Sequence, residues 1–203
     1  MCRIDQHRNI GRSNNENTGV LQGSPRKKGN TAALLRYVLE GMEQNVNISI
    51  DTVTLCEEKI QPCRGCSSCQ DTLEPDCVIK DSMKGLYDKV REAQLIVLAT
   101  PLYWWNVSST LKLFIDRLYA LMMGEDNRNL AGKKLIVILT YGGSDPNSGV
   151  DIVTKMFTEI TEFTGMKLDK VYGVCSGELD VEKNHSAANS ARQIGATLTA
   201  SSL

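Results

Sequence analysis

Two short runs in which every residue is apolar, 95–99 and 135–139, constrain the fold more than any other feature of the sequence. Each run has the length of a strand, and a strand without polar residues must be covered on both faces, as in a parallel sheet. Between such strands, apolar residues recur with helical spacing, for example at Leu34, Leu35 and Val38. Strands that alternate with helices indicate right-handed βαβ crossovers and a doubly wound parallel sheet.

The same periodicity predicts the order of the elements along the chain. Strands are expected at Val20 and Leu21 and over residues 46–55, 95–100, 135–140 and 168–174. Helices are expected over residues 31–42, from 81 or 82 to about 93, 108–123, 149–164 and 187–200. Asn30 is the expected N-cap of the first helix, and Asp81 or Ser82 that of the second. Five strands without a G-x-G-x-x-G turn favour an α/β, flavodoxin-like three-layer sandwich with a five-stranded parallel sheet of order 2-1-3-4-5.

The length of 203 residues fits one such domain. Residues 1–17 are polar and are expected to form a disordered N-terminal arm, with the domain over 18–203 and a cysteine-rich loop over 56–80. No apolar run approaches the length of a signal or membrane segment, so we expect a cytoplasmic protein. A formal net charge of -1 argues against nucleic acid or a membrane as partner and favours small molecules or other proteins.

The turn 23–31, G-S-P-R-K-K-G-N-T, joins the first strand to the first helix. A helix N-terminus offers free backbone N–H groups and a positive dipole end, which suit a phosphate. Ser24, Asn30 and Thr31 add side-chain donors, and Arg26 adds a charge that can contact two phosphate oxygens. An ordinary capped turn with solvated basic residues is the alternative.

Both tryptophans of the chain lie in the segment 100–108, just after a buried strand. A flat aromatic ligand would explain this position, with Asn106 and Ser108 as further donors, and the alternative is an aromatic plug or a subunit contact. The paired glycines after Tyr141 allow a ligand to approach the backbone closely. These loops follow the first, third and fourth strands, so they should surround one crevice at the switch point of the sheet.

The segments G-S-P-R-K-K-G-N-T at 23–31, P-L-Y-W-W-N-V-S at 101–108 and L-K-L-F-I-D-R at 111–117 resemble the NADPH-dependent FMN reductase family of flavodoxin-like proteins. The resemblance implies FMN as cofactor, NAD(P)H as electron donor, and a homodimer or homotetramer with the flavin at a subunit interface. It places Ser24, Arg26, Asn30 and Thr31 at the phosphate. It places Pro101, Leu102, Tyr103, Trp104, Asn106 and Val107 near the ring, with Tyr141 and Gly142 on its other side.

The sequence departs from the family in one place. The segment 15–19 is polar where an apolar central strand is expected before the phosphate loop, which predicts weaker packing below that loop. Within 111–117, Lys112 and Asp116 have the spacing of an ordinary surface ion pair, and neither they nor Arg117 are assigned a catalytic role.

Four cysteines, Cys63, Cys66, Cys69 and Cys77, form the pattern C-x2-C-x2-C-x7-C. Three thiols at successive short spacings can surround one side of a compact cluster that a fourth closes, whereas zinc sites more often use two separated pairs. The motif is similar to that of iron-sulfur flavoproteins, a subgroup of the same family, which implies a 4Fe-4S cluster. Zinc, and free or disulfide-forming thiols, remain the alternatives.

Histidine chemistry has little support, because His7 lies in the polar arm and His185 at the start of the last helix. The sequence therefore predicts an oxidoreductase that transfers electrons from NAD(P)H or a reduced, ferredoxin-like protein through FMN, and by way of the cluster, to a small-molecule or protein acceptor. A cluster-free NAD(P)H-dependent FMN or quinone reductase, and a non-enzymatic electron carrier or redox sensor, are the competing hypotheses.

Overall fold

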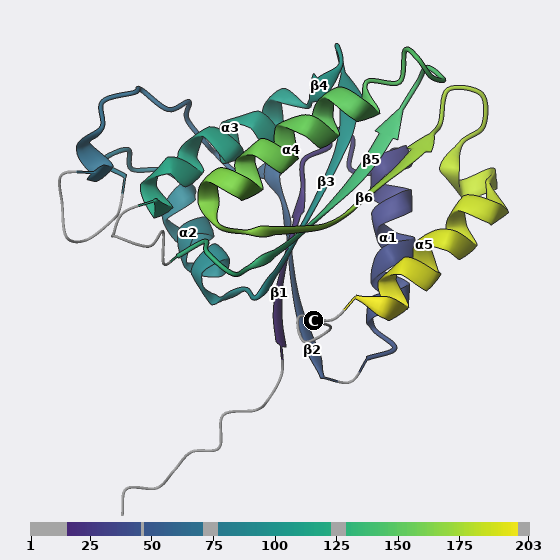
Figure 1. Cartoon of the computed structure of the whole chain (residues 1–203), viewed down its shortest axis with the longest axis horizontal. Coiled ribbons are helices and arrows are strands. Elements are labelled where there is room, and N and C mark those ends of the chain that lie inside the picture. Colours follow the sequence, from purple (N-terminus) through teal and green to yellow (C-terminus); the bar gives the residue numbers. More distant parts are fainter. Residues whose placement is uncertain (1–15, 46, 71–76, 123–128, 199–203) are drawn as a thin grey trace, which may run out of the picture.

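A parallel sheet forms the centre of the molecule (Figure 1). The computed structural model describes residues 16–45, 47–70, 77–122 and 129–198. The five parallel strands are β1 (Glu16–Gln22), β2 (Ile48–Thr54), β3 (Leu95–Tyr103), β5 (Lys134–Tyr141) and β6 (Lys167–Cys175). They lie in the order β2-β1-β3-β5-β6, so the predicted order 2-1-3-4-5 is confirmed. A sixth strand, β4 (Asn106–Val107), pairs antiparallel with the end of β3.

Helices cover both faces of this sheet (Figure 1). One face carries α1 (Asn30–Met42) and α5 (His185–Thr197), and the other carries α2 (Met83–Glu92), α3 (Ser109–Arg117) and α4 (Val150–Thr164). Short 3-10 turns lie at η1 (Leu55–Glu57), η2 (Ser68–Gln70), η3 (Leu118–Leu121) and η4 (Val181–Lys183). The predicted helix 108–123 thus ends as an α-helix at Arg117 and continues as a 3-10 turn. None of the helices in the described residues is both long and apolar enough to cross a bilayer.

The two apolar runs behave as their composition predicts. In β3, Leu95, Val97 and Ala99 pack towards α1 and α5, while Ile96 and Leu98 pack towards the opposite layer. The alternation follows from the twofold side-chain period of a strand. Because both faces are covered, the sheet has two apolar cores, one on each side.

The first strand contains polar residues that the sequence assigned to the arm and to a weakened strand. β1 begins at Glu16, so the predicted arm is two residues too long, and residues 1–15 lie outside the described part. The strand forms because its backbone pairs with β2 and β3, and this pairing does not require apolar side chains. Asn17 lies at the amino end of the strand, where its side chain is exposed. Gly19 leaves room for Ala93, whose Cβ would lie 3.4 Å from an added Cβ. The buried half, Val20 and Leu21, directly precedes the phosphate loop.

Candidate functional site

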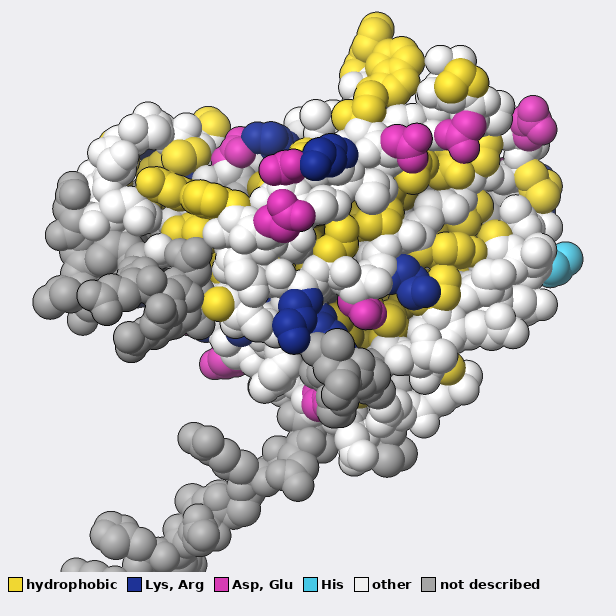
Figure 2. Space-filling model, in the orientation of Figure 1, with side chains coloured by type: hydrophobic (Ala, Val, Ile, Leu, Met, Phe, Trp, Pro, Cys, Tyr) yellow, Lys and Arg dark blue, Asp and Glu magenta, His cyan; other side chains and the backbone are white. Residues whose placement is uncertain are grey.

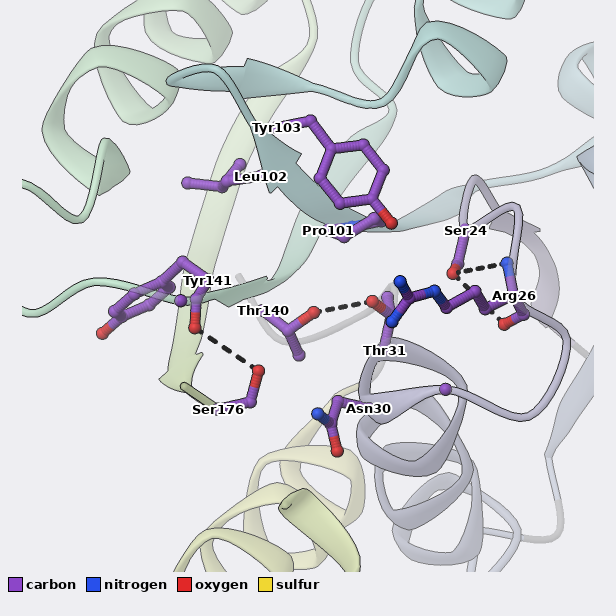
Figure 3. A pocket seen from close by; sticks show the side chains of 12 residues that line it. Ser24, Arg26, Asn30, Thr31, Pro101, Leu102, Tyr103, Thr140, Tyr141 and Ser176 are labelled. Atoms are coloured by element: carbon purple, nitrogen blue, oxygen red, sulfur yellow. Dashed lines mark hydrogen bonds between the residues drawn. The ribbon is translucent and has the colours of Figure 1, made fainter. Parts of the chain in front are cut away.

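A cavity of about 350 Å³ lies where the loops after β1, β3, β5 and β6 converge (Figure 3). Ligand sites of doubly wound sheets occur at this carboxyl edge. Nine of the predicted cofactor-binding residues line it, together with three that sequence reasoning missed. The lining residues are Ser24, Arg26, Gly29, Asn30, Thr31, Pro101, Leu102, Tyr103, Thr140, Tyr141, Gly142 and Ser176.

One end of the cavity is built for an anion. The loop after β1 is held by Ser24, whose Oγ accepts a hydrogen bond from the Arg26 N–H at 3.1 Å and donates to the Arg26 carbonyl at 3.2 Å. Helix α1 begins after Gly29, which has no side chain to cap the first turn. The N–H groups of that turn are therefore free to bind an anion. Figure 3 shows the Arg26 guanidinium extended towards Thr31 at this end.

Asn30 has a different role from the predicted N-cap. Its Oδ1 accepts the Val181 N–H at 2.9 Å, and its Nδ2 donates to Asp180 at 3.3 Å. The N-cap is Gly29. Asn30 therefore ties the phosphate loop to the segment after β6, and it still lines the cavity.

A buried pair of hydroxyls joins the phosphate loop to the neighbouring strand. The Oγ1 atoms of Thr31 and Thr140 lie 2.6 Å apart, and both side chains are buried (Figure 3). Thr140 and Ser176 follow or end strands without belonging to a recognisable motif. Their only sequence signal is a hydroxyl residue at the carboxyl end of a strand, which is too common to single them out.

The other end of the cavity has flat and open walls. Pro101, Leu102 and Tyr103 form one side, and Tyr141 forms the other (Figure 3). Gly142, the next residue in the chain, also lines the cavity. An added Cβ on Gly142 would meet nothing within 4 Å, so the backbone there is open to a ligand. Burial, followed by the charges of Cys175 and Asp145, raises the pKa of Tyr141 further above neutral pH. Its phenol is therefore a hydrogen-bond donor at neutral pH.

The tip of the β3–β4 hairpin only partly matches expectation. Trp104 is 89% exposed and lines a smaller adjoining cavity with Trp105 and Tyr141. Figure 2 shows hydrophobic side chains projecting at the end of the molecule where β4 lies in Figure 1. Trp104 and Trp105 have φ values of 50° and 56°, a conformation that asparagine and glycine usually supply in two-residue hairpin turns.

Asn106, Val107 and Ser108 line neither the main cavity nor the adjoining one. Val107 packs into the apolar core, and the Asn106 side chain accepts the Val107 N–H at 2.8 Å. Ser108, predicted as a donor to the ring, is buried and donates instead to the Gly23 carbonyl. Its hydroxyl also accepts the Leu111 N–H, which caps α3. Ser108 therefore fixes the phosphate loop and does not face the ligand.

The four motif cysteines differ in exposure. Cys63 and Cys66 are exposed, Cys77 is half-buried and Cys69 is buried. Residues 71–76 between the last two lie outside the described part, and the described residues bring no three metal-ligating side chains together. Four thiols are a suitable donor set for iron or zinc, but in this arrangement they do not yet form a closed site.

Comparison with known proteins gives the following relationships. The sequence model of the NADPH-dependent FMN reductase family matches residues 17–173. An iron-sulfur flavoprotein of Methanocaldococcus jannaschii is 33% identical over 123 residues, which cover 61% of this chain and 62% of that protein. A Bacillus subtilis protein, YwqN, described provisionally as an NAD(P)H-dependent FMN-containing oxidoreductase, is 26% identical over 86% of this chain and 94% of its own.

Solved structures share the fold. An FMN-dependent NADH-azoreductase from Bacillus anthracis, in complex with FMN, superimposes with a TM-score of 0.66 at 16% identity, over 89% of this chain and 98% of that one. The chain spans only 54% to 63% of the length of the first iron-sulfur flavoproteins that it matches. Because the family match extends over most of the sequence, from residue 17 to residue 173, this protein belongs to the NADPH-dependent FMN reductase family.

Proposed function

We propose that this protein is an FMN-dependent oxidoreductase that takes electrons from NAD(P)H or a reduced protein donor and passes them through a 4Fe-4S cluster to an acceptor. The observation that carries the proposal is a cavity that has an anion-binding end on α1 and an open end between two loops. Its volume of about 350 Å³ is within the range of small-molecule sites, about 300–1,000 Å³.

The residues of the cavity fit FMN. The free N–H groups of the first turn of α1, the Ser24 loop and Arg26 would bind the phosphate. Pro101 to Tyr103 would contact one side of the isoalloxazine and Tyr141 with Gly142 the other. When bound, FMN accepts a hydride equivalent and can release electrons singly or in pairs.

The protein's own contribution is to hold and orient the ring. The contact between Thr31 and Thr140 joins the phosphate loop to β5, the strand that ends at Tyr141 on the other side of the cavity. Tyr141, kept neutral, can donate a hydrogen bond to an acceptor atom at the ring end.

A 4Fe-4S cluster would be held by Cys63, Cys66, Cys69 and Cys77. Support comes from the cysteine spacing and from the relatives named iron-sulfur flavoproteins. When bound, such a cluster stores single electrons. A second candidate is a cluster-free FMN-dependent reductase. It is favoured by one observation: the described residues bring no three of the thiols or other metal-ligating side chains together.

The test is anaerobic purification followed by iron and sulfide analysis and an absorption spectrum before and after NADPH, and then dithionite. We expect flavin bands that bleach with a reductant, and a broad absorption from the cluster that also bleaches. Flavin without iron would select the cluster-free reductase. A protein that binds no flavin after incubation with FMN would contradict the proposal as a whole.

A further inference from the structure

Helix α3 connects the phosphate loop to the cysteine-rich loop. At its start, the buried Ser108 donates a hydrogen bond to the carbonyl of Gly23, and an added Cβ on Gly23 would lie 2.6 Å from the Cβ of Leu111. At its end, Arg117 is buried under the cysteine-rich loop. The nine residues of α3 span about 13 Å at 1.5 Å per residue. One rigid element therefore contacts both regions.

The sequence assigned no catalytic role to Arg117, and the structure buries its side chain, which is only 1% exposed. Its Nη1 donates to Asp81 Oδ2 at 2.7 Å and its Nη2 to Asp81 Oδ1 at 3.2 Å, a forked ion pair in which the carboxylate is 2% exposed. Nη1 also donates to the carbonyl of Gln61 at 2.8 Å. The helical register turns this position inward, which the alternation of charged and apolar residues in 111–117 did not reveal.

These contacts close the neck of the cysteine-rich loop. Gln61 lies just before the first motif cysteine and Asp81 just after the last, and the Gln61 N–H donates to Asp81 Oδ2 at 2.8 Å. Lys59 and Ser82 add a second bridge, in which the Lys59 N–H donates to the Ser82 Oγ at 3.1 Å. Both ends of the loop are thus tied to each other and, through Arg117, to α3.

A further attachment lies within the loop itself. Gln70, directly after Cys69, donates from Nε2 to the carbonyl of Tyr119 at 2.8 Å, in the 3-10 turn that follows α3. The Tyr87 hydroxyl donates to the Arg117 carbonyl at 3.2 Å and fixes the helix end from the other side. The described part of the loop is therefore fastened mainly to the segment that begins at Arg117.

The guanidinium keeps its charge although it is buried. Burial alone would lower the pKa of Arg117, but the hydrogen bond to Asp81 and the charges of Tyr87, Asp81 and Cys77 outweigh it and raise the pKa, so the group stays cationic. Cys77 lines a cavity of about 290 Å³ with Asp81, Tyr87, Lys80 and Lys84. The Arg117 Nε is buried and has no acceptor among the described residues, so one donor remains unused.

We propose that Arg117 is the positioning residue of the cysteine-rich loop: it closes the neck between Gln61 and Asp81 and fixes both ends of the loop to α3, the helix whose start contacts the phosphate loop. Buried ion pairs are weak contributors to net stability, so fixing an arrangement is the better account of this one. The identity of the group that the thiols bind rests on the proposed function. The positioning role of Arg117 is independent of the proposed function, because its contacts fix the loop in the metal-free chain.

Two variants remove the clamp. Arg117→Met leaves the Asp81 carboxylate unpaired in a buried place, and the double variant Asp81→Asn/Arg117→Met avoids this if the single variant does not fold. Arg117→Lys keeps the charge but cannot form the forked pair. Arg192→Met is the matched control, since Arg192 pairs with Glu40 between α5 and α1 on the opposite face of the sheet.

The first readout is trypsin cleavage of the metal-free protein after Arg64, which is exposed in the loop between Cys63 and Cys66. Cleavage after Lys155, within α4, reports global unfolding. We expect both Met variants to be cut about tenfold faster after Arg64, with unchanged cleavage after Lys155, because local opening governs the rate. Arg117→Lys should be intermediate, and Arg192→Met should match the wild type.

The second readout is iron and acid-labile sulfide per bound FMN after anaerobic purification. We expect the Arg117→Met and double variants to lose most of their iron while they retain FMN binding. Wild-type cleavage and wild-type iron content in both variants would overturn the proposal, and so would equal acceleration after Arg64 and Lys155. A wild-type protein without iron would instead remove the cluster from the proposed function, and the Arg64 cleavage alone would then decide the role of Arg117.

Discussion

The buried hydroxyl of Ser108 offers the sharpest test of how the phosphate loop is held. It donates to the Gly23 carbonyl and accepts the Leu111 N–H at 3.1 Å, so Ser108→Ala removes an N-cap and leaves a buried carbonyl without this donor. Loss of the cap costs about 1 kcal/mol, and loss of a partner for a buried polar group costs about 1–3 kcal/mol. The expected destabilisation is therefore about 2–4 kcal/mol.

For a chain of this size, 1 kcal/mol corresponds to about 2–4 °C in Tm, so Ser108→Ala should lower the Tm of the flavin-free protein by roughly 4–16 °C. Circular dichroism during heating measures this shift. FMN binding should weaken by about tenfold if about 1.4 kcal/mol of the loss reaches the phosphate loop. Ser109→Ala is the matched control, because Ser109 is exposed and its side chain makes no hydrogen bond to the described residues. Equal Tm values for the two variants would refute the reasoning.

Three further outcomes are expected. Burial raises the pKa of Tyr87 from 10.0 to about 12, so the neutral phenol stabilises the folded state fully below pH 10, and this stability is lost as the pH rises towards 12. Tyr87→Phe should therefore lose less stability between pH 9 and pH 11 than the wild type, as measured by urea titrations at the two pH values. An equal loss in both proteins would count against the prediction. Thr140→Val should lower the free energy of unfolding by about 1–2 kcal/mol. In a double-mutant cycle, the variant that also carries Thr31→Val should lose less than the sum of the two single losses, whereas simple additivity would exclude the hydroxyl pair. Gly41→Ala places a Cβ 2.1 Å from the Arg192 carbonyl oxygen and should lower the free energy of unfolding by about 3 kcal/mol or more. Gly85→Ala, whose Cβ would meet nothing within 4 Å, should stabilise α2 by up to about 1 kcal/mol. Equal denaturation midpoints for these two variants would contradict the packing.

The strand order was predictable because its signal is dense. Every residue of 95–99 and 135–139 is apolar, and only a doubly covered parallel strand accommodates such runs. The amino end of β1 was underestimated for the opposite reason. Its residues form the strand through backbone pairing, which is independent of side-chain polarity.

The candidate site was predictable where a residue type is tied to a local geometry. The turn 23–31 has such a tie, because a phosphate needs a helix N-terminus. Ser108, Thr140 and Arg117 have none, since their partners are 85, 109 and 36 residues away in the sequence. Contacts between such distant positions depend on how helices and strands pack, and a single sequence does not contain that information.

The central claim is that one end of the cavity binds a phosphate and the other a flavin ring. The most direct measurement is a titration of the flavin-free protein with FMN and, separately, with riboflavin, which lacks the phosphate, repeated with Arg26→Met. Hydrogen bonds to a charged group are worth about 1.5–3 kcal/mol each, so at least two of them predict FMN binding more than about 100-fold tighter than riboflavin, and a smaller ratio for the variant. Equal affinities for the two flavins, or binding of neither, would contradict it.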